Sequence, residues 1–131
     1  MKQKILNLAK KTHQASLELS HLTTSQKNKA LRSIVSQIKN NKELILKANQ
    51  KDVSLAKKNN INSALLDRLI LDDKRIQGIV NSVKDVIRLK DPVGAIVEKR
   101  KRNGLDIKKV RIPLGVIGMI FESRPNVTVD A

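Results

Sequence analysis

A continuous apolar segment, "PLGVIGMIF" at residues 113–121, is the feature that most constrains the fold of this chain. The segment contains no charged residue and is followed directly by the polar sequence "ESRPN". A short apolar run between turn signals is typical of a strand buried on both faces, as in the parallel sheet of an α/β protein. We therefore expect residues 114–121 to form such a strand, which needs other strands beside it.

Residues 1–91, before the apolar segment, are predicted to be helical. Apolar or small residues recur at the three- and four-residue spacing that places them on one helix face. These faces contain Ile5, Ala9, Thr12, Ser16 and Leu19; Leu31, Ile34, Val35 and Ile38; Leu44, Ile45, Ala48, Leu55 and Ala56; and Ile76, Ile79, Val80, Val83 and Ile87. Each helix is amphipathic and therefore needs a partner surface.

Polar residues divide this region into separate helices. The first helix is expected over residues 2–22, and a short turn of helix is expected over residues 64–69. The breaks between helices are predicted at Thr23-Thr24-Ser25, Asn40-Asn41 and Asn59-Asn60. Asp72 or Asp73 is expected to cap the last helix, because Asp accepts hydrogen bonds from the free N–H groups of a helix start.

The pattern changes at Asp91-Pro92, since a proline favours an extended residue before it. Residues 92–112 are predicted to form a β-hairpin with strands at 94–98 and 105–112 and with Asn103-Gly104 in the turn. The apolar residues change parity across Lys108-Lys109, which indicates a bulge or a change of exposed face. The connecting sequence "KRKRNG" is expected to be a solvated hairpin tip.

The formal net charge of +15 raises the question of an acidic partner such as nucleic acid. The lysines are spread along the whole chain, however, and the only dense basic cluster is at residues 99–102. Phe121 is the single aromatic residue, so side chains on which bases could stack are almost lacking. This pattern argues against nucleic-acid binding as the main function.

Several other classes of protein are excluded by composition. No apolar run approaches the roughly 18 residues that a membrane-spanning helix needs, so we expect no membrane contact. The sequence has no pattern of a signal peptide, and we expect a cytoplasmic protein. With zero cysteines the chain has no disulfide and no thiolate nucleophile, and no metal site is expected.

The polar residues after the apolar segment form the candidate site. Ligands of open α/β sheets bind where the strands end, and Pro125 suits the first turn of a helix. Glu122, Ser123, Arg124 and Asn126 would then surround a helix N-terminus, which favours an anionic group. Arg124 could clamp a phosphate or carboxylate, and Asn126 could donate its amide hydrogens to an oxygen on which charge develops. The alternative is that these side chains face water or cap the helix.

The motif "PLGVIGMIFESRPNVTVDA" resembles that of γ-glutamyl phosphate reductase, also called glutamate-5-semialdehyde dehydrogenase, a family of the aldehyde dehydrogenase superfamily. The segments "LLDRLILDDKRIQGIVNSVKDVIRLKDPVG", "KNKALRSIVSQI" and "ILKANQKDV" are also similar to the helix-rich N-terminal part of that family. Only the "EKRKRNG" tip is more basic than the family pattern. The resemblance covers essentially all 131 residues.

The resemblance implies an α/β fold in which residues 1–131 are the N-terminal part of one NADP-binding, Rossmann-like domain. Residues 1–91 would be its helices, residues 92–112 a β-hairpin, and residues 113–131 the first parallel strand and the start of the following helix. The family's catalytic domain would be missing from this sequence.

The resemblance also implies a function in proline biosynthesis. The family is an NADPH-dependent oxidoreductase that converts L-glutamyl 5-phosphate to L-glutamate 5-semialdehyde and phosphate through a cysteine thioester, and the full-length enzyme is expected to be a homo-oligomer. Asn126 is then the candidate oxyanion donor, and Glu122, Ser123, Arg124 and Asn126 would border the substrate and cofactor site. Because the nucleophilic cysteine is absent, we expect this chain alone to be inactive and to bind NADPH poorly. The alternative is a non-catalytic basic helical module that binds a protein partner or nucleic acid.

Overall fold

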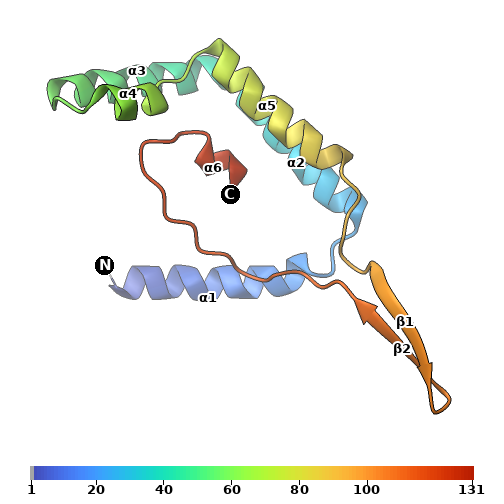
Figure 1. Cartoon of the computed structure of the whole chain (residues 1–131). Helices are drawn as coiled ribbons and strands as arrows, with labels where there is room; N and C mark the ends of the chain where they lie inside the picture. The colour runs from blue at the N-terminus through green and yellow to red at the C-terminus, as the bar shows by residue number, and fades with distance from the viewer. Residues whose placement is uncertain (1) are drawn as a thin grey trace. The chain divides into compact units, whose positions relative to one another are not determined.

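The computed structural model describes residues 2–131 (Figure 1). The elements are α1 (Lys2–Leu19), α2 (Thr24–Asn40), α3 (Lys42–Lys58), α4 (Ser63–Leu69), α5 (Asp73–Arg88), β1 (Ile96–Arg102), β2 (Leu105–Val110) and α6 (Val127–Asp130). The chain divides into two compact units: residues up to 24 with residues 90–118, and residues 25–89 with residues 119–131. The described part is mostly helical and contains one two-stranded antiparallel sheet.

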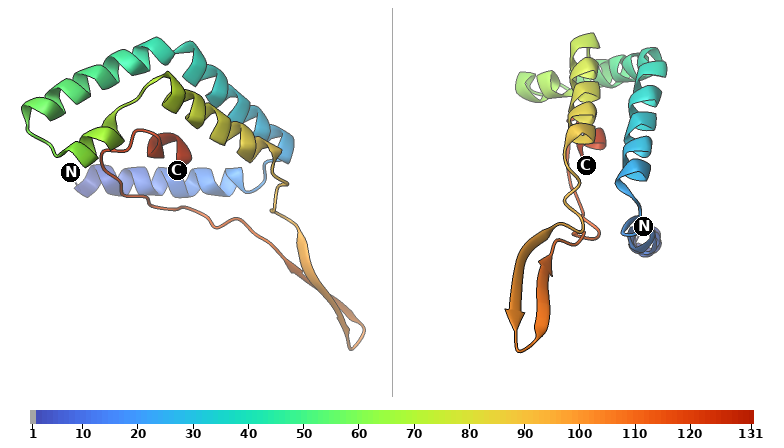
Figure 2. Two further views of the ribbon diagram at one scale, coloured as in Figure 1. Left: turned by 45° about the horizontal axis from the view of Figure 1, so that its top comes forward. Right: turned by 90° about the vertical axis from the view of Figure 1, so that its right-hand side faces the viewer.

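The unit of residues 25–89 and 119–131, here called the helical unit, contains the buried apolar residues. These are Ala56 on α3 and Ile76, Ile79, Val80 and Val83 on α5. The α5 residues have the spacing of one helix face, so the apolar face predicted for this helix is confirmed. Helices α2 and α5 run side by side and antiparallel (Figures 1 and 2), and the Asn28 Nδ2 atom lies 3.5 Å from the carbonyl oxygen of Ile87.

Polar residues set the helix boundaries of this unit close to the predicted positions. Asn41 separates α2 from α3, and α4 begins at Ser63, one residue before the predicted start. Of the two candidate caps for α5, Asp72 is the one used: its Oδ1 atom accepts a hydrogen bond from the Arg75 N–H at 2.6 Å. The prediction of a cap at this point is therefore confirmed.

The other unit contains α1 and the hairpin. Helix α1 ends at Leu19 rather than at residue 22, and none of its described residues is buried. The turn of the hairpin is as predicted: Asn103 and Gly104 have φ angles of 50° and 79°, the positive values that a tight two-residue hairpin turn requires. None of the helices within residues 2–131 is long and apolar enough to cross a membrane.

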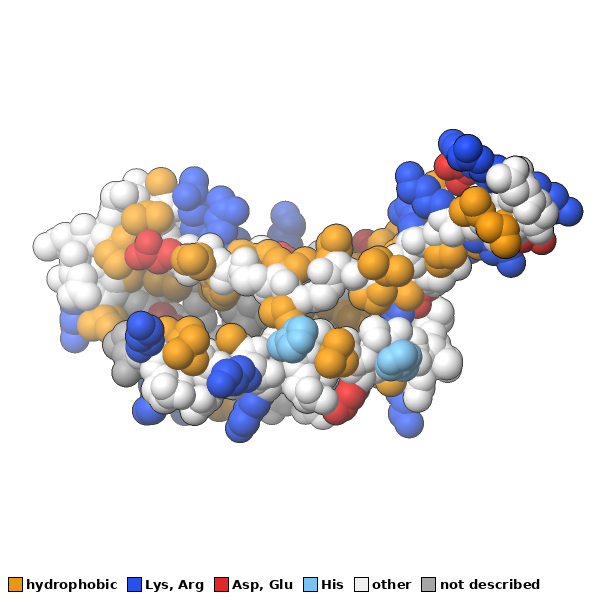
Figure 3. Space-filling view, turned by 90° about the horizontal axis from the view of Figure 1, so that it is seen from below, with side chains coloured by type: hydrophobic (Ala, Val, Ile, Leu, Met, Phe, Trp, Pro, Cys, Tyr) orange, Lys and Arg blue, Asp and Glu red, His pale blue; other side chains and the backbone are white. Residues whose placement is uncertain are grey.

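The hairpin differs from the predicted one in its strand bounds and in its bulge: β1 begins at Ile96 rather than at residue 94, and β2 ends at Val110 rather than at residue 112. Residues 99–102 are not a loop but the end of β1, because the two-residue turn lets them pair with residues 105–108 of β2. Lys and Arg side chains consequently gather along the hairpin (Figure 3). The irregularity in pairing lies between Ile96 and Glu98 of β1, which are opposite Val110 and Lys109 of β2. The extra residue is therefore on β1, whereas the sequence indicated a bulge or a change of exposed face on β2.

Residues 113–122 form no strand in the structure, which differs from the predicted parallel strand over residues 114–121. A strand buried on both faces needs a hydrogen-bonded neighbour on each side, and none of the residues 2–131 supplies one. Gly115 also has a φ of +86°, which interrupts an extended backbone. The apolar side chains of this segment are exposed as a result, including Leu114 at 89% and Ile120 at 102%.

Candidate functional site

A groove of about 360 Å³ lies in the helical unit, where the loop before α6 meets α4 and α5. The groove combines apolar side chains with both signs of charge. Its lining residues are Asp67, Arg68, Ile70, Leu71, Arg75, Gly78, Ile79, Ser82, Arg124, Pro125, Asn126 and Asp130. It is therefore the place where the sequence-predicted loop residues meet polar side chains from other elements.

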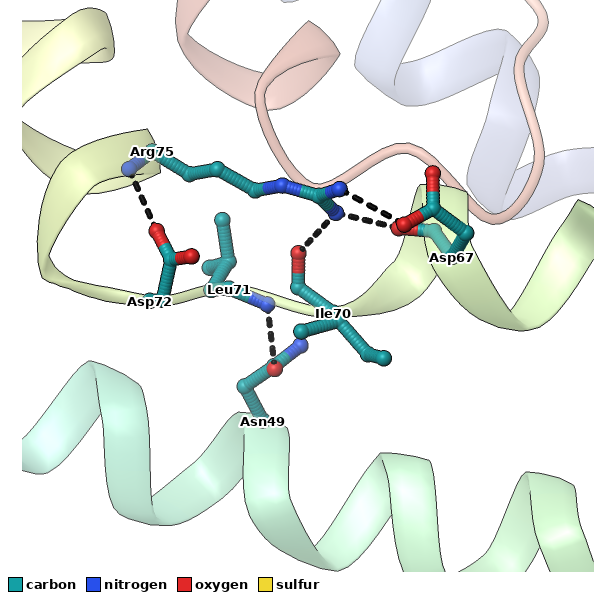
Figure 4. Close-up of polar contacts among 6 residues, drawn as sticks. All are labelled: Asn49, Asp67, Ile70, Leu71, Asp72 and Arg75. Atoms are coloured by element: carbon teal, nitrogen blue, oxygen red, sulfur yellow. Dashed lines mark hydrogen bonds and ion pairs between the residues drawn. The ribbon is translucent and has the colours of Figure 1, made fainter.

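Arg75 holds one wall of this groove in place (Figure 4). From α5 its guanidinium reaches back over the α4–α5 connection, where Nη2 lies 2.8 Å from Asp67 Oδ1 and Nη1 lies 2.7 Å from the Ile70 carbonyl oxygen. Nη1 also donates to the carbonyl oxygen of Asp67. The planar, forked shape of the guanidinium allows one side chain to bind these acceptors together.

Asn49 holds the same connection from the opposite side (Figure 4). Its Nδ2 donates to the Leu69 carbonyl oxygen at 2.8 Å, and its Oδ1 accepts a hydrogen bond from the Leu71 N–H at 2.7 Å. Asn49 is only 6% exposed, so both hydrogen bonds are largely shielded from water. The backbone between α4 and α5 is thus fixed by one side chain from α3 and one from α5.

Asn126 precedes α6 and lines the groove, but its side chain does not cap the helix. Its Nδ2 atom instead donates to Asp130 Oδ2 at 2.8 Å. An amide group has two N–H donors, and the second one has no hydrogen-bond partner among residues 2–131. One donor of this side chain is therefore bound to Asp130, and the other makes no hydrogen bond within the described residues.

The structure brings together only two of the four candidate residues. Arg124 and Asn126 line the groove, whereas Glu122 and Ser123 do not. Ser123 has a φ of 53°, a left-handed backbone conformation that turns the chain before Pro125. The expected helix N-terminus is short, because α6 spans only residues 127–130 of the described chain, so the helix dipole adds little there.

Sequence reasoning missed Asn49, Arg68 and Arg75. A signal existed for Asn49, because it lies four residues after Ile45 and seven before Ala56, on the apolar face predicted for its helix. A polar side chain on a buried face needs hydrogen-bond partners. No comparable signal singled out Arg68 or Arg75 among the many basic residues. Within residues 2–131, no His, Asp and Glu side chains cluster in a way that could hold a metal ion.

No family model matches the chain. Individual proteins do: it is 53% identical over 127 residues to the γ-glutamyl phosphate reductase of Desulforamulus reducens and 46% identical over 132 residues to that of Halothermothrix orenii. These alignments cover 96% and 100% of this chain but only 31% and 32% of the relatives. The chain thus spans about a third of the length of the curated relatives that it matches.

Solved structures agree with the sequence comparison. The crystal structure of γ-glutamyl phosphate reductase from Thermotoga maritima matches 95% of this chain with a TM-score of 0.91 at 45% identity. That from Saccharomyces cerevisiae matches 95% with a TM-score of 0.90 at 32% identity. The matches cover 30% and 32% of those chains.

The fold is therefore that of a segment of a reductase. More specifically, the chain is a homologue of γ-glutamyl phosphate reductase that spans about a third of the enzyme's length. The family resemblance found in the sequence is thus confirmed.

Proposed function

We propose that this chain forms the N-terminal part of the cofactor domain in a cytoplasmic, NADPH-dependent reductase. The enzyme would convert L-glutamyl 5-phosphate to L-glutamate 5-semialdehyde and phosphate in proline biosynthesis. The observation that carries the proposal is 53% identity to a γ-glutamyl phosphate reductase across 96% of the chain. The groove beside the 124–126 loop supports it, because that loop lies within the motif that resembles the family.

In this proposal Asn126 donates a hydrogen bond to the carbonyl oxygen of the acyl phosphate as negative charge develops on it. The donor is the amide hydrogen that Asp130 does not occupy, and the Asn126–Asp130 hydrogen bond orients the group before substrate binds. Arg124 supplies positive charge at the same groove, and Glu122 and Ser123 belong to the loop at its border. The family's cysteine nucleophile would come from outside these residues, since this sequence contains none.

The residues present do not form a dinucleotide site by themselves. NADPH would supply a hydride in the family reaction, but this chain has no G-x-G-x-x-G turn between a strand and a helix to hold its phosphates. The groove, at about 360 Å³, is at the small end of the usual range for ligand sites, roughly 300–1,000 Å³. We therefore expect these residues alone to bind NADPH poorly and the complete enzyme to hold the whole dinucleotide.

The exposed apolar segment is consistent with this incomplete site. In the complete domain residues 114–121 would be the first strand of a parallel sheet, with neighbouring strands that cover side chains such as Leu114 and Ile120. We therefore expect the 131-residue chain alone to lack reductase activity. Assembly of the complete enzyme as a homo-oligomer is part of the same expectation.

A chimera tests the proposal. This chain replaces the matched 127 residues of the Desulforamulus reducens reductase, and NADPH oxidation that depends on L-glutamyl 5-phosphate is followed by absorbance. The proposal predicts activity within about tenfold of the parent enzyme and none for the 131-residue chain alone. A soluble, folded chimera without activity would refute it, as would activity of the chain alone.

A further inference from the structure

We propose that the groove between α4, α5 and the 124–126 loop binds a phosphoryl group, with Arg68 and Arg124 as its two cationic ligands. Both arginines line the groove and both are exposed. Neither side chain has a hydrogen bond or ion pair to any of the residues 2–131. They come from segments more than 50 residues apart in sequence, so the fold itself brings the two free guanidinium groups to one groove.

Of the other charged groups of the groove, Arg75 and Asp67 are paired with each other, and Asp130 bonds to an uncharged side chain. Arg75 binds Asp67 and the Ile70 carbonyl oxygen, and the Asp130 carboxylate accepts the hydrogen bond from Asn126. With Arg75 and Asp67 neutralising each other, the unpaired charges are two arginines against the single carboxylate of Asp130. The groove therefore favours an anion.

The backbone that carries Arg68 is held more firmly than an ordinary surface turn. Arg75 binds the carbonyl groups on both sides of it, at Asp67 and Ile70, and Asn49 binds the carbonyl of Leu69. Fixing the backbone reduces the entropy that a ligand must remove when it orders the Arg68 side chain. The backbone position of Arg68 is thus fixed, although its side chain is exposed.

The geometry favours phosphate over a carboxylate. A phosphoryl group presents oxygens in several directions and can accept hydrogen bonds from more than one guanidinium, and the groove is lined by two arginines and the amide of Asn126. The inference deepens the proposed function and rests on it for the identity of the ligand, because both the acyl phosphate substrate and the cofactor carry phosphoryl groups.

The test is a titration of the ¹⁵N-labelled 131-residue chain with inorganic phosphate, at an ionic strength held constant with sodium chloride. Arginine Nε–H signals are followed by NMR in the wild type and in R68Q, R124Q and R32Q. Arg32 on α2 is the matched control, since it is also exposed and also lacks a partner among the described residues. Circular dichroism verifies that each variant keeps the wild-type helix content.

The signals of Arg68 and Arg124 should shift to saturation, and R68Q and R124Q should each weaken phosphate binding about tenfold while R32Q leaves it unchanged. Shifts that never saturate, or equal weakening in R32Q, would overturn the inference. Acetyl phosphate and adenosine 2′,5′-bisphosphate then compete with inorganic phosphate, and the tighter competitor identifies substrate or cofactor as the source. Failure of both to compete would overturn the assignment.

This result is independent of the chimera assay. An active chimera together with no saturable phosphate binding refutes the Arg68–Arg124 site alone. Saturable phosphate binding together with an inactive chimera refutes the reductase proposal alone.

Discussion

Asn49 and Leu71 lie 22 residues apart in the sequence, yet the Leu71 N–H donates to Asn49 Oδ1 at 2.7 Å. The same side chain donates to the Leu69 carbonyl oxygen at 2.8 Å. One buried amide group therefore joins α3 to the connection between α4 and α5. Because that connection also forms a wall of the groove, the hydrogen bonds that stabilise the fold also hold the backbone next to Arg68.

Replacing Asn49 by Leu should destabilise the chain by about 2–4 kcal/mol, because it leaves the Leu71 N–H and the Leu69 carbonyl without partners in a shielded place. The free energy of unfolding is measured by urea titration with circular dichroism. Ser54→Ala is the matched control on the same helix: Ser54 is exposed and bonds only to the Gln50 carbonyl, so the change should be below about 0.5 kcal/mol. Equal effects of the two substitutions would contradict the role of Asn49.

Arg75→Lys should cost about 1–2 kcal/mol, although the charge is conserved. A lysine cannot reach Asp67 and both backbone carbonyls with one planar group. The Asp67–Arg75 pair is partly exposed, so most of the loss comes from the backbone hydrogen bonds rather than from the charge pair.

Arg88→Lys is the control for this substitution, because Arg88 has only an exposed pair with Asp85. It should change stability by less than about 0.5 kcal/mol. Hydrogen exchange gives a second readout: Arg75→Lys should lower protection at the Leu71 amide. If Arg75→Lys changed neither the stability nor the protection of the Leu71 amide, the guanidinium would not hold the connection between α4 and α5.

The ion pair between Lys42 and Asp73 links the start of α3 to the start of α5, with Lys42 Nζ 2.7 Å from Asp73 Oδ1. The hydrogen bond that Lys42 donates to the Asp73 carboxylate, together with the negative charge of that carboxylate, raises the pKa of Lys42 above the ordinary value of 10.5. A raised lysine pKa means that the stabilisation is complete below pH 10.5 and disappears as pH rises through the folded-state pKa.

Comparing Lys42→Gln with the wild type measures this contribution. The wild type should have the higher melting temperature at about pH 9, and the difference should shrink as the pH rises above 10.5 and through the raised folded-state pKa of Lys42, where the folded chain also loses this charge. Lys47→Gln on the same helix is the control. A difference that persists unchanged to the higher pH would show that the ion pair is not its origin.

Local signals in the sequence predicted much of the secondary structure. The spacing of Ile76, Ile79, Val80 and Val83 gave the buried face of α5, Asp72 gave its cap, and Asn103-Gly104 gave the hairpin turn. Each of these features depends on neighbours within a few residues, which is why a single sequence was enough.

Features that depend on distant parts of the chain were missed or misplaced. The strand expected at residues 114–121 is absent because pairing needs neighbouring strands, which no periodicity in this sequence provides. Arg124 and Asn126 were predicted as site residues from local chemistry, whereas Arg68 lies on α4 and only the fold brings it to the lining of the same groove. Glu122 and Ser123 looked equivalent to Arg124 and Asn126 in the sequence, yet they do not line the groove. The chain makes a left-handed turn at Ser123, before the residues that do.

The most direct test of the central claim is the turnover number of the chimera with Asn126→Ala. The free amide hydrogen of Asn126 is assigned to the oxygen on which charge develops, so kcat should fall about 10²-fold while KM for L-glutamyl 5-phosphate changes little. Asn81→Ala is the control, because Asn81 on α5 is an exposed partner of Gln77 and lies outside the groove lining. Unchanged kcat in a folded Asn126→Ala chimera would contradict the assignment of this loop to the reductase site.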